Sequence, residues 1–154
     1  MKILIVEDDE NKRGHIESFL RVERRETDVH QAASVISALQ MIRSHSFDLI
    51  ILDMTLPNYD IGEDRSSGGM HAFGGEEVLR QMNRFKISTP VIVFTQFETF
   101  GKPPDSMNLE ELNQSMHEKF PRTYKGAVYY HAAIHDWTLE LGDMIESIRG
   151  GSEQ

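Results

Sequence analysis

The chain has 154 residues, a length that suits one domain built around one hydrophobic core. The formal net charge of -9 disfavours direct binding to nucleic acid, and the lack of cysteine excludes disulfides and zinc-thiolate sites. No apolar run approaches the ~20 residues of a transmembrane helix, and no signal segment precedes the first strand, so we expect a cytoplasmic protein without membrane insertion.

Strands and helices alternate in the first part of the chain. The apolar run Met1–Val6 predicts a strand, which is followed by an acidic run. Helical spacing of apolar residues over 16–20 predicts a helix, and 27–33 reads as a weaker strand. Ser34 is a suitable N-cap for a second helix, whose apolar stripe lies within 35–42. This alternation predicts a parallel sheet covered on both sides.

The central strand is predicted over Leu49–Leu52, which is apolar and branched without a polar break. Such a run is typical of a strand that is buried on both faces. It presents Asp53 at its carboxyl end, and Pro57 then stops regular structure. Ligands of open α/β sheets bind at the carboxyl ends of strands, so Asp53 is a candidate for chemistry. The alternative is that Asp53 only caps the following turn.

The first strand also ends in acidic residues. If the first and central strands lie side by side and parallel, Glu7, Asp8 and Asp53 come together at one edge of the sheet. Carboxylates gathered away from water require a cation, and hard oxygen ligands of this kind suit Mg²⁺. The alternative is a solvated helix start, where acids favour the helix dipole. Both can hold, with Asp9 and Glu10 serving the helix.

The second part of the chain is less regular. Residues 58–75 are rich in glycine, serine and charge, which predicts a loop much longer than the ~2–6 residues common between strand and helix. A third helix is predicted over Glu76–Phe85, and a fourth strand over Pro90–Phe94 with Thr95 at its tip. Another extended segment, broken by glycine and proline, begins the stretch 97–125.

The remaining elements complete an alternating pattern. Ser106 is the expected cap of a fourth helix, Gly126–His131 reads as a fifth strand, and Asp136 is the expected cap of a fifth helix that Gly150-Gly151 closes.

Five strands and five helices fit a flavodoxin-like parallel sheet of order 2-1-3-4-5 with helices on both faces. We expect one domain over residues 1–150, extended loops at about 58–75 and 97–125, and a tail at 151–154.

Three stretches, in this order, resemble the response-regulator receiver domain. They are Ile3–Glu10, Asp48–Pro57 and Pro90–Thr95. The resemblance implies that Asp53 is the phosphoacceptor, a carboxylate nucleophile that takes a phosphoryl group from a histidine kinase or phosphotransfer protein. Because no output domain follows, it also implies a downstream protein partner, for which the two extended segments are the expected surfaces.

The resemblance further implies a magnesium site. Asp8 would bind Mg²⁺ directly together with Asp53, Glu7 would bind it through water, and Thr55 would supply its backbone carbonyl. A phosphoryl group and a carboxylate repel each other, and Mg²⁺ neutralises both.

Two switch residues are implied in the same way. Thr95 matches the hydroxyl that bonds the phosphoryl oxygen, and Tyr130 matches the aromatic residue that changes rotamer with it. Core packing explains Tyr130 about as well as switching does.

One departure from the family pattern follows the fifth strand. Ala133 and Ile134 stand where receivers have Lys and Pro. Losing one electrostatic stabiliser of this kind can cost on the order of 10²–10³ in rate. We expected Lys102, Lys125 or Arg65 to reach towards Asp53 from the long loops instead.

Two other functions compete with phosphorelay signalling. A phosphorylation-independent pseudo-receiver, acting as a protein–protein interaction module, is favoured by the missing lysine. A phosphohydrolase using Asp53 ranks lower, since Thr55 stands where such chemistry needs a second acid. We therefore expect a phosphoacceptor with at most self-phosphorylation and dephosphorylation chemistry, and no enzyme in the usual sense.

Overall fold

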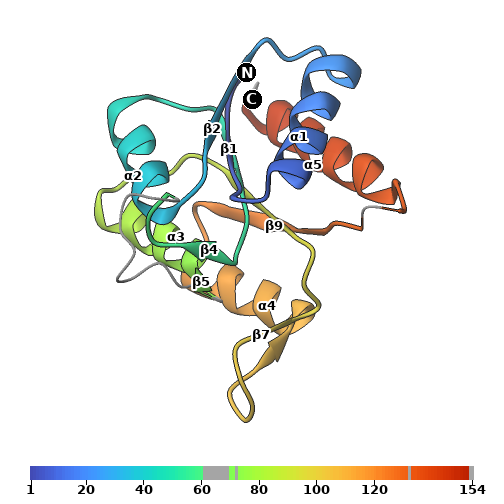
Figure 1. The fold of residues 1–154 in the computed structure, drawn as a ribbon. Coiled ribbons are helices and arrows are strands. Elements are labelled where there is room, and N and C mark those ends of the chain that lie inside the picture. Colours follow the sequence, from blue (N-terminus) through green and yellow to red (C-terminus); the bar gives the residue numbers. More distant parts are fainter. Residues whose placement is uncertain (61–69, 72, 132, 153–154) are drawn as a thin grey trace.

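A computed structural model describes residues 1–60, 70–71, 73–131 and 133–152 of the chain (Figure 1). Its centre is a five-stranded parallel sheet in the order β2-β1-β3-β6-β9. The strands are β1 (Lys2–Val6), β2 (Asp28–Ala32), β3 (Leu49–Leu52), β6 (Val91–Thr95) and β9 (Tyr124–Tyr129). Since these are the first to fifth sheet strands along the chain, the predicted order 2-1-3-4-5 and the flavodoxin-like architecture are confirmed.

Among the described residues, five α-helices connect and cover these strands. They are α1 (Glu10–Ser18), which continues as the π-helical turn η1 (Phe19–Glu23), α2 (Val35–Ser44), α3 (Gly74–Arg84), α4 (Leu109–Lys119) and α5 (Asp136–Ser152). Two short antiparallel pairs lie outside the main sheet: β4 (Leu56–Pro57) with β5 (Met70–His71), and β7 (Thr99–Phe100) with β8 (Met107–Asn108).

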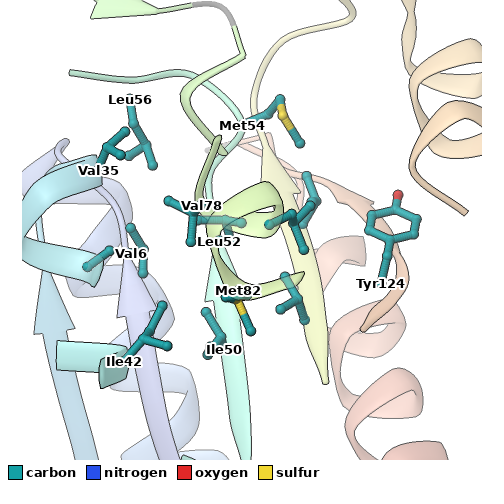
Figure 2. Close-up of a cluster of buried hydrophobic side chains, with 14 of the residues drawn as sticks. Val6, Val35, Ile42, Ile50, Leu52, Met54, Leu56, Val78, Met82 and Tyr124 are labelled. Atoms are coloured by element: carbon teal, nitrogen blue, oxygen red, sulfur yellow. The ribbon is translucent and has the colours of Figure 1, made fainter. Parts of the chain in front are cut away.

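The sheet divides the core into two layers. Successive strand residues point to opposite faces, so Ile3 and Ile5 pack with α1 and α5, whereas Leu4 and Val6 pack with α2, α3 and α4. Figure 1 shows α1 beside α5, on the other side of the sheet from α2 and α3. Figure 2 shows the second of these layers, in which Ile50 and Leu52 of β3 lie among side chains of α2 and α3.

Side-chain N-caps define the first residues of α2 and α4, close to the predicted helix starts. The Ser34 side chain accepts from the Ser37 amide and forms a capping box for α2, as predicted. The cap of α4 is Asn108, so the prediction of Ser106 is wrong. Asn108 lies three residues before Glu111, and this spacing lets each side chain bond the other residue's amide.

Other boundaries differ from the expected ones by a few residues. The last strand begins at Tyr124, and Gly126 lies inside it, at a register shift against β6, with a φ of 147° that favours glycine. Helix α5 continues through Gly150 to Ser152. The stretch 97–125 contains the β7–β8 hairpin and α4, while residues 61–69 and 72 of the predicted 58–75 loop lie outside the described residues. Within the described chain, no helix has the length and apolarity to cross a membrane.

Candidate functional site

Strands β1 and β3 bring their carboxyl ends to the same point. Val6 is level with Leu52 in the parallel register, and the Asp53 amide donates to the Val6 carbonyl at 2.9 Å. The next residue of each strand is therefore an acid, Glu7 on one side and Asp53 on the other. The pairing of two apolar strands is what positions the polar site.

The expected acidic cluster is present. Ligand oxygens of Glu7, Asp8 and Asp53 all lie within 4.8 Å of one another. Glu7 and Asp53 are buried, with 2% and 4% of their surface exposed, and Asp8 lies at the mouth of the site with intermediate exposure. The amides of Asp9 and Thr55 approach Glu7 Oε2 and Asp53 Oδ1 at 3.2 and 3.4 Å. The structure thus places the carboxylates as the sequence indicated, with Thr55 directly beside them.

Burial and mutual repulsion raise the proton affinity of these acids. Burial, with the neighbouring Asp53 charge as the next cause, raises the pKa of Glu7 to about 7. Burial and then the charge of Glu7 raise the pKa of Asp8 to about 6. Burial also raises the pKa of Asp53, although the Lys12 ammonium opposes this shift. The cluster therefore carries more negative charge than its surroundings stabilise.

Lys12 is a member of the site that the sequence analysis did not identify. Its side chain is 2% exposed, and its Nζ lies 2.6 Å from Glu7 Oε1 and 3.4 Å from Asp53 Oδ1. The surrounding residues 10–14 are polar and suggested a solvated helix. A signal was nevertheless available, because Lys12 is four residues before Ile16 and eight before Leu20, on the buried stripe of α1.

The start of α1 holds Lys12 in this position. The Asp9 side chain accepts from the amides of Asn11 and Lys12, which caps the helix as expected for an acid there. Arg13 Nη1 donates to the Glu7 carbonyl at 2.9 Å. These bonds tie the first turn of α1 to the end of β1, so the lysine side chain is directed at the carboxylates.

Helix α3 closes against the backbone of Asp53. The Gly75 amide donates to the Met54 carbonyl at 2.9 Å, and a Cβ added at Gly75 would lie 2.6 Å from the Asp53 carbonyl oxygen. A Cβ at Gly74 would meet the Leu56 carbonyl oxygen at 2.8 Å. Only glycine permits this close approach of helix and loop. Sequence analysis assigned both glycines to the loop that precedes the helix.

Thr95 and Tyr130 lie at the ends of the neighbouring strands. Thr95 is fully buried at the end of β6, and its Oγ1 accepts from the Phe97 amide at 3.1 Å. Tyr130 follows β9, is buried against Phe94 and Trp137, and its hydroxyl lies 2.5 Å from His15 Nδ1. Their switch roles stay predictions, but both lie at the edge of the sheet where the acids gather.

Of the three basic residues proposed to replace the missing lysine, the two that the structure describes, Lys102 and Lys125, do not reach the site. Lys102 is exposed in the β7–β8 hairpin segment, and Lys125 is exposed and lines a cavity together with Asp48 and Pro90, at the amino ends of the strands. Arg65 lies outside the described residues. Ala133, at the position of the receiver lysine, is exposed. Within the described chain, the basic group within 4 Å of the Asp53 carboxylate is Lys12.

The donor set of this cluster fits a divalent cation. Three carboxylates face one ammonium, so the balance of formal charge is two negative charges. Oxygen ligands alone suit Mg²⁺, which takes one or two carboxylates and keeps several waters. Asp8 is the most exposed of the three acids, which leaves the mouth of the site open to a hydrated ion. Glu7, Asp8 and Asp53 are thus the residues that would hold it.

Comparison with known proteins agrees with this site. Residues 3–65 match the family described as the response regulator receiver domain. The chain is 32% identical over 143 residues to the Detocs response regulatory protein DtcB of Enterobacter cloacae, covering 92% of this chain and 95% of that protein. It is 37% identical over 142 residues to the uncharacterized protein y4jR of Sinorhizobium fredii, covering 92% and 94%.

Solved structures share the fold. The N-terminal domain of a response regulator/sensory box/GGDEF protein from Carboxydothermus hydrogenoformans superimposes with a TM-score of 0.62 at 21% identity, covering 99% of this chain and 97% of that one. The response regulator TrrA of Thermotoga maritima gives 0.58 at 19% identity, covering 94% and 99%.

The fold and the site together define a flavodoxin-like α/β domain with an acidic site at the carboxyl edge of its sheet. The chain belongs to the response regulator receiver domain family, a family of two-component signalling.

Proposed function

We propose that the protein accepts a phosphoryl group on Asp53 and passes the signal to a protein partner by a change of surface at the ends of β6 and β9. The observation that carries this proposal is the convergence of Glu7, Asp8 and Asp53 within 4.8 Å, with Asp53 buried at the carboxyl end of the central strand. A structural carboxylate does not need two more acids beside it, whereas a phosphoacceptor that works with a divalent cation does.

The transfer step needs an activated phosphoryl donor, such as the phosphohistidine of a kinase or phosphotransfer protein. An Asp53 carboxylate oxygen attacks phosphorus, the P–N bond to the donor imidazole breaks as the P–O bond forms, and the imidazole nitrogen takes a proton from solvent. Asp53 is held in place for this attack by the hydrogen bond that its amide donates to the Val6 carbonyl and by the close packing of Gly75 against its own carbonyl.

The metal site would be formed by Asp8 and Asp53 directly, by Glu7 through water, and by the Thr55 carbonyl. Mg²⁺, when bound, supplies positive charge to both the carboxylate and the phosphoryl oxygens. The raised pKa values of Glu7 and Asp8 support this assignment, because they reflect carboxylates that lack sufficient positive charge nearby. TrrA, a structural neighbour, is described in complex with Mg²⁺-BeF, which is compatible with such a site in this fold.

The hydrogen bond that Thr95 now makes supports a role for this residue in switching the segment after β6. Thr95 Oγ1 accepts from the Phe97 amide, and the Phe97 side chain is 40% exposed. If the hydroxyl turns to a phosphoryl oxygen on Asp53, this bond to Phe97 is lost and the segment after β6 is released. Ile134, after β9, is 52% exposed. These apolar side chains support a partner surface on this side of the molecule.

The cellular setting follows from the same proposal. We place the protein in the cytoplasm, where a histidine kinase or phosphotransfer protein donates the phosphoryl group and a downstream protein reads the switched surface. We propose no turnover of external substrates: Thr55 lies beside Asp53 where a hydrolase needs a second acid, and its amide approaches Asp53 Oδ1.

Phosphoramidate with MgCl₂, followed by intact mass measurement, tests the proposal. We expect one phosphoryl adduct on the unmodified chain, none on Asp53→Asn, and an unchanged adduct on the matched control Asp48→Asn, whose carboxylate lies at the other end of β3 and accepts from the Lys2 amide. An adduct that survives in Asp53→Asn contradicts the assignment of the acceptor.

A pseudo-receiver that acts only as a binding module is the second candidate. It is favoured by Ala133 at the position of the receiver lysine, because that position offers no cation. The same experiment separates the two functions: a folded protein that binds Mg²⁺ but takes no phosphoryl group from phosphoramidate is a pseudo-receiver.

A further inference from the structure

Lys12 is unusual for a lysine because its charged end is buried. Only 2% of its surface is exposed, and its Nζ lies 5.6 Å above the centre of the Phe94 ring. Lysine is almost never buried this deeply unless it is paired, because removing an ammonium from water costs several kcal/mol. The pairing partners are Glu7 at 2.6 Å and Asp53 at 3.4 Å. The fold therefore holds a cation at the candidate phosphoacceptor.

A purely structural role accounts poorly for this arrangement. An apolar side chain on the buried stripe of α1 would pack against Ile16 and Leu20 without any desolvation cost, and buried ion pairs are weak contributors to stability compared with apolar residues of similar volume. The Lys12 ammonium also contacts two carboxylates, that of Glu7 and that of the candidate phosphoacceptor Asp53.

Phosphorylation would increase the need for a cation at this point. An acyl phosphate on Asp53 replaces one negative charge by about two, in a site where two further carboxylates already lie within 4.8 Å. Receivers place a lysine after the last strand for this charge, but this chain has Ala133 at that position. Lys102 and Lys125 are exposed at other places on the surface. Among the described residues, Lys12 is the basic side chain with a nitrogen within 4 Å of the Asp53 carboxylate.

We propose that Lys12 supplies the ammonium that contacts the phosphoryl group on Asp53, and so replaces, from helix α1, the lysine that is missing after β9. The proposal rests on the proposed function of Asp53. In the phosphorylated state, Lys12 Nζ keeps its contact with Glu7 Oε1 and replaces its contact with Asp53 Oδ1 by one with a phosphoryl oxygen. Lysine acts here as a point charge that can follow its partner over a short distance.

The first test compares phosphorylation rates with phosphoramidate and MgCl₂, followed by intact mass. We expect Lys12→Met to slow phosphorylation on the order of 10²-fold, and Lys12→Arg to restore part of the rate because it keeps the charge. The matched control Lys125→Met, at the other end of the sheet, should keep the unmodified rate. Lys12→Gln provides the same comparison if the methionine variant does not fold, as judged by circular dichroism.

The second test distinguishes loss of a phosphoryl contact from general damage to the site. Removing a positive charge beside the acids should tighten Mg²⁺ binding, by roughly tenfold, in calorimetric titrations of Lys12→Met at about pH 8. A variant that is merely distorted would bind Mg²⁺ more weakly and accept phosphate more slowly. Tighter metal binding with slower phosphorylation is therefore the expected signature, and weaker metal binding overturns the proposal.

The two proposals fail in different ways. If the unmodified chain takes up no phosphoryl group, the proposed function of Asp53 fails, and the role of Lys12 fails with it. If the unmodified chain is phosphorylated and Lys12→Met is phosphorylated equally fast, the role of Lys12 alone is overturned.

Discussion

The two edges of the sheet treat buried carboxylates in opposite ways. At the amino edge, Glu26 is buried with two cations: the Met1 ammonium lies 3.0 Å from Oε2, and Arg149 pairs with Oε1. At the carboxyl edge, the described residues bring three carboxylates together, and two of them, Glu7 and Asp53, pair with the ammonium of Lys12. Buried carboxylates thus have an excess of positively charged partners at the amino edge and too few at the carboxyl edge.

The difference separates charge that stabilises the fold from charge that is available for binding. The charge of a carboxylate with two cationic partners, such as Glu26, is already balanced, so a metal ion would bind weakly there. Carboxylates that are buried and repel one another keep raised pKa values, as Glu7 and Asp8 do, and binding a divalent cation stabilises their charged forms. This contrast, more than the presence of acids, marks the carboxyl edge as the functional one.

The largest expected effect is on metal affinity. Asp8→Asn removes the most exposed carboxylate of the cluster and should weaken Mg²⁺ binding by about 10²-fold, measured by calorimetric titration at about pH 8. The same substitution at the amino edge, Asp48→Asn, should leave the affinity unchanged. Equal affinities for Asp8→Asn and the unmodified protein would show that the metal does not use this cluster.

Replacing a buried carboxylate by an amide should change the stability of the metal-free protein very differently at the two edges. Glu26→Gln leaves two cations without their carboxylate and should destabilise the fold by about 1–3 kcal/mol. Glu7→Gln removes repulsion while Asp53 remains to pair with Lys12, so it should cost less than about 0.5 kcal/mol or stabilise. Urea unfolding with EDTA at about pH 8 measures both. A comparable loss in both variants would remove the distinction between the edges.

The pH dependence of stability sharpens the same contrast. The folded state binds protons more tightly than the unfolded state, since the pKa of Glu7 rises from 4.5 to about 7 and that of Asp8 from 3.8 to about 6. Stability of the metal-free protein should therefore fall as pH rises through this window, by about 1–3 kcal/mol in total. Saturating MgCl₂ should reduce the fall. Urea midpoints that rise steadily over the same range without metal would contradict the raised values.

The smallest expected effect concerns the link between the carboxyl edge and α1. Tyr130→Phe removes the hydroxyl that bonds His15 and should cost about 0.5–1.5 kcal/mol. A double-mutant cycle with His15→Ala measures the coupling of the two side chains by urea unfolding. Strictly additive effects would mean that the contact between Tyr130 and His15 contributes no coupling energy between α1 and the end of β9.

Sequence reasoning was most successful where one periodic pattern decides the outcome. The branched apolar runs of β1 and β3 determined the parallel pairing, and the pairing determined that Glu7, Asp8 and Asp53 meet. Boundaries were harder to predict where several polar residues stand near a helix start, and Ser106 was predicted as the cap where the structure has Asn108.

The missed part of the site has a different cause. Lys12 follows five polar or charged residues, a pattern typical of a solvated helix start, and its burial depends on partners that are 5 and 41 positions away in the sequence. Local propensity does not reveal such tertiary pairing, although the helical stripe containing Ile16 and Leu20 carried the signal. The close packing of Gly75 on Asp53 was hidden for the same reason, since it depends on where α3 docks.

The aromatic layer between α1 and α5 has a practical consequence. Trp137 is the single tryptophan of the chain, and its ring packs 5.3 Å from Phe94 and 5.6 Å from Tyr130, measured between ring centres. The ring of Phe94 in turn carries the Lys12 ammonium on its face. The tryptophan fluorescence of the unlabelled protein thus comes from an indole one aromatic ring removed from the ionic site, and we expect it to change in real time when that site is occupied.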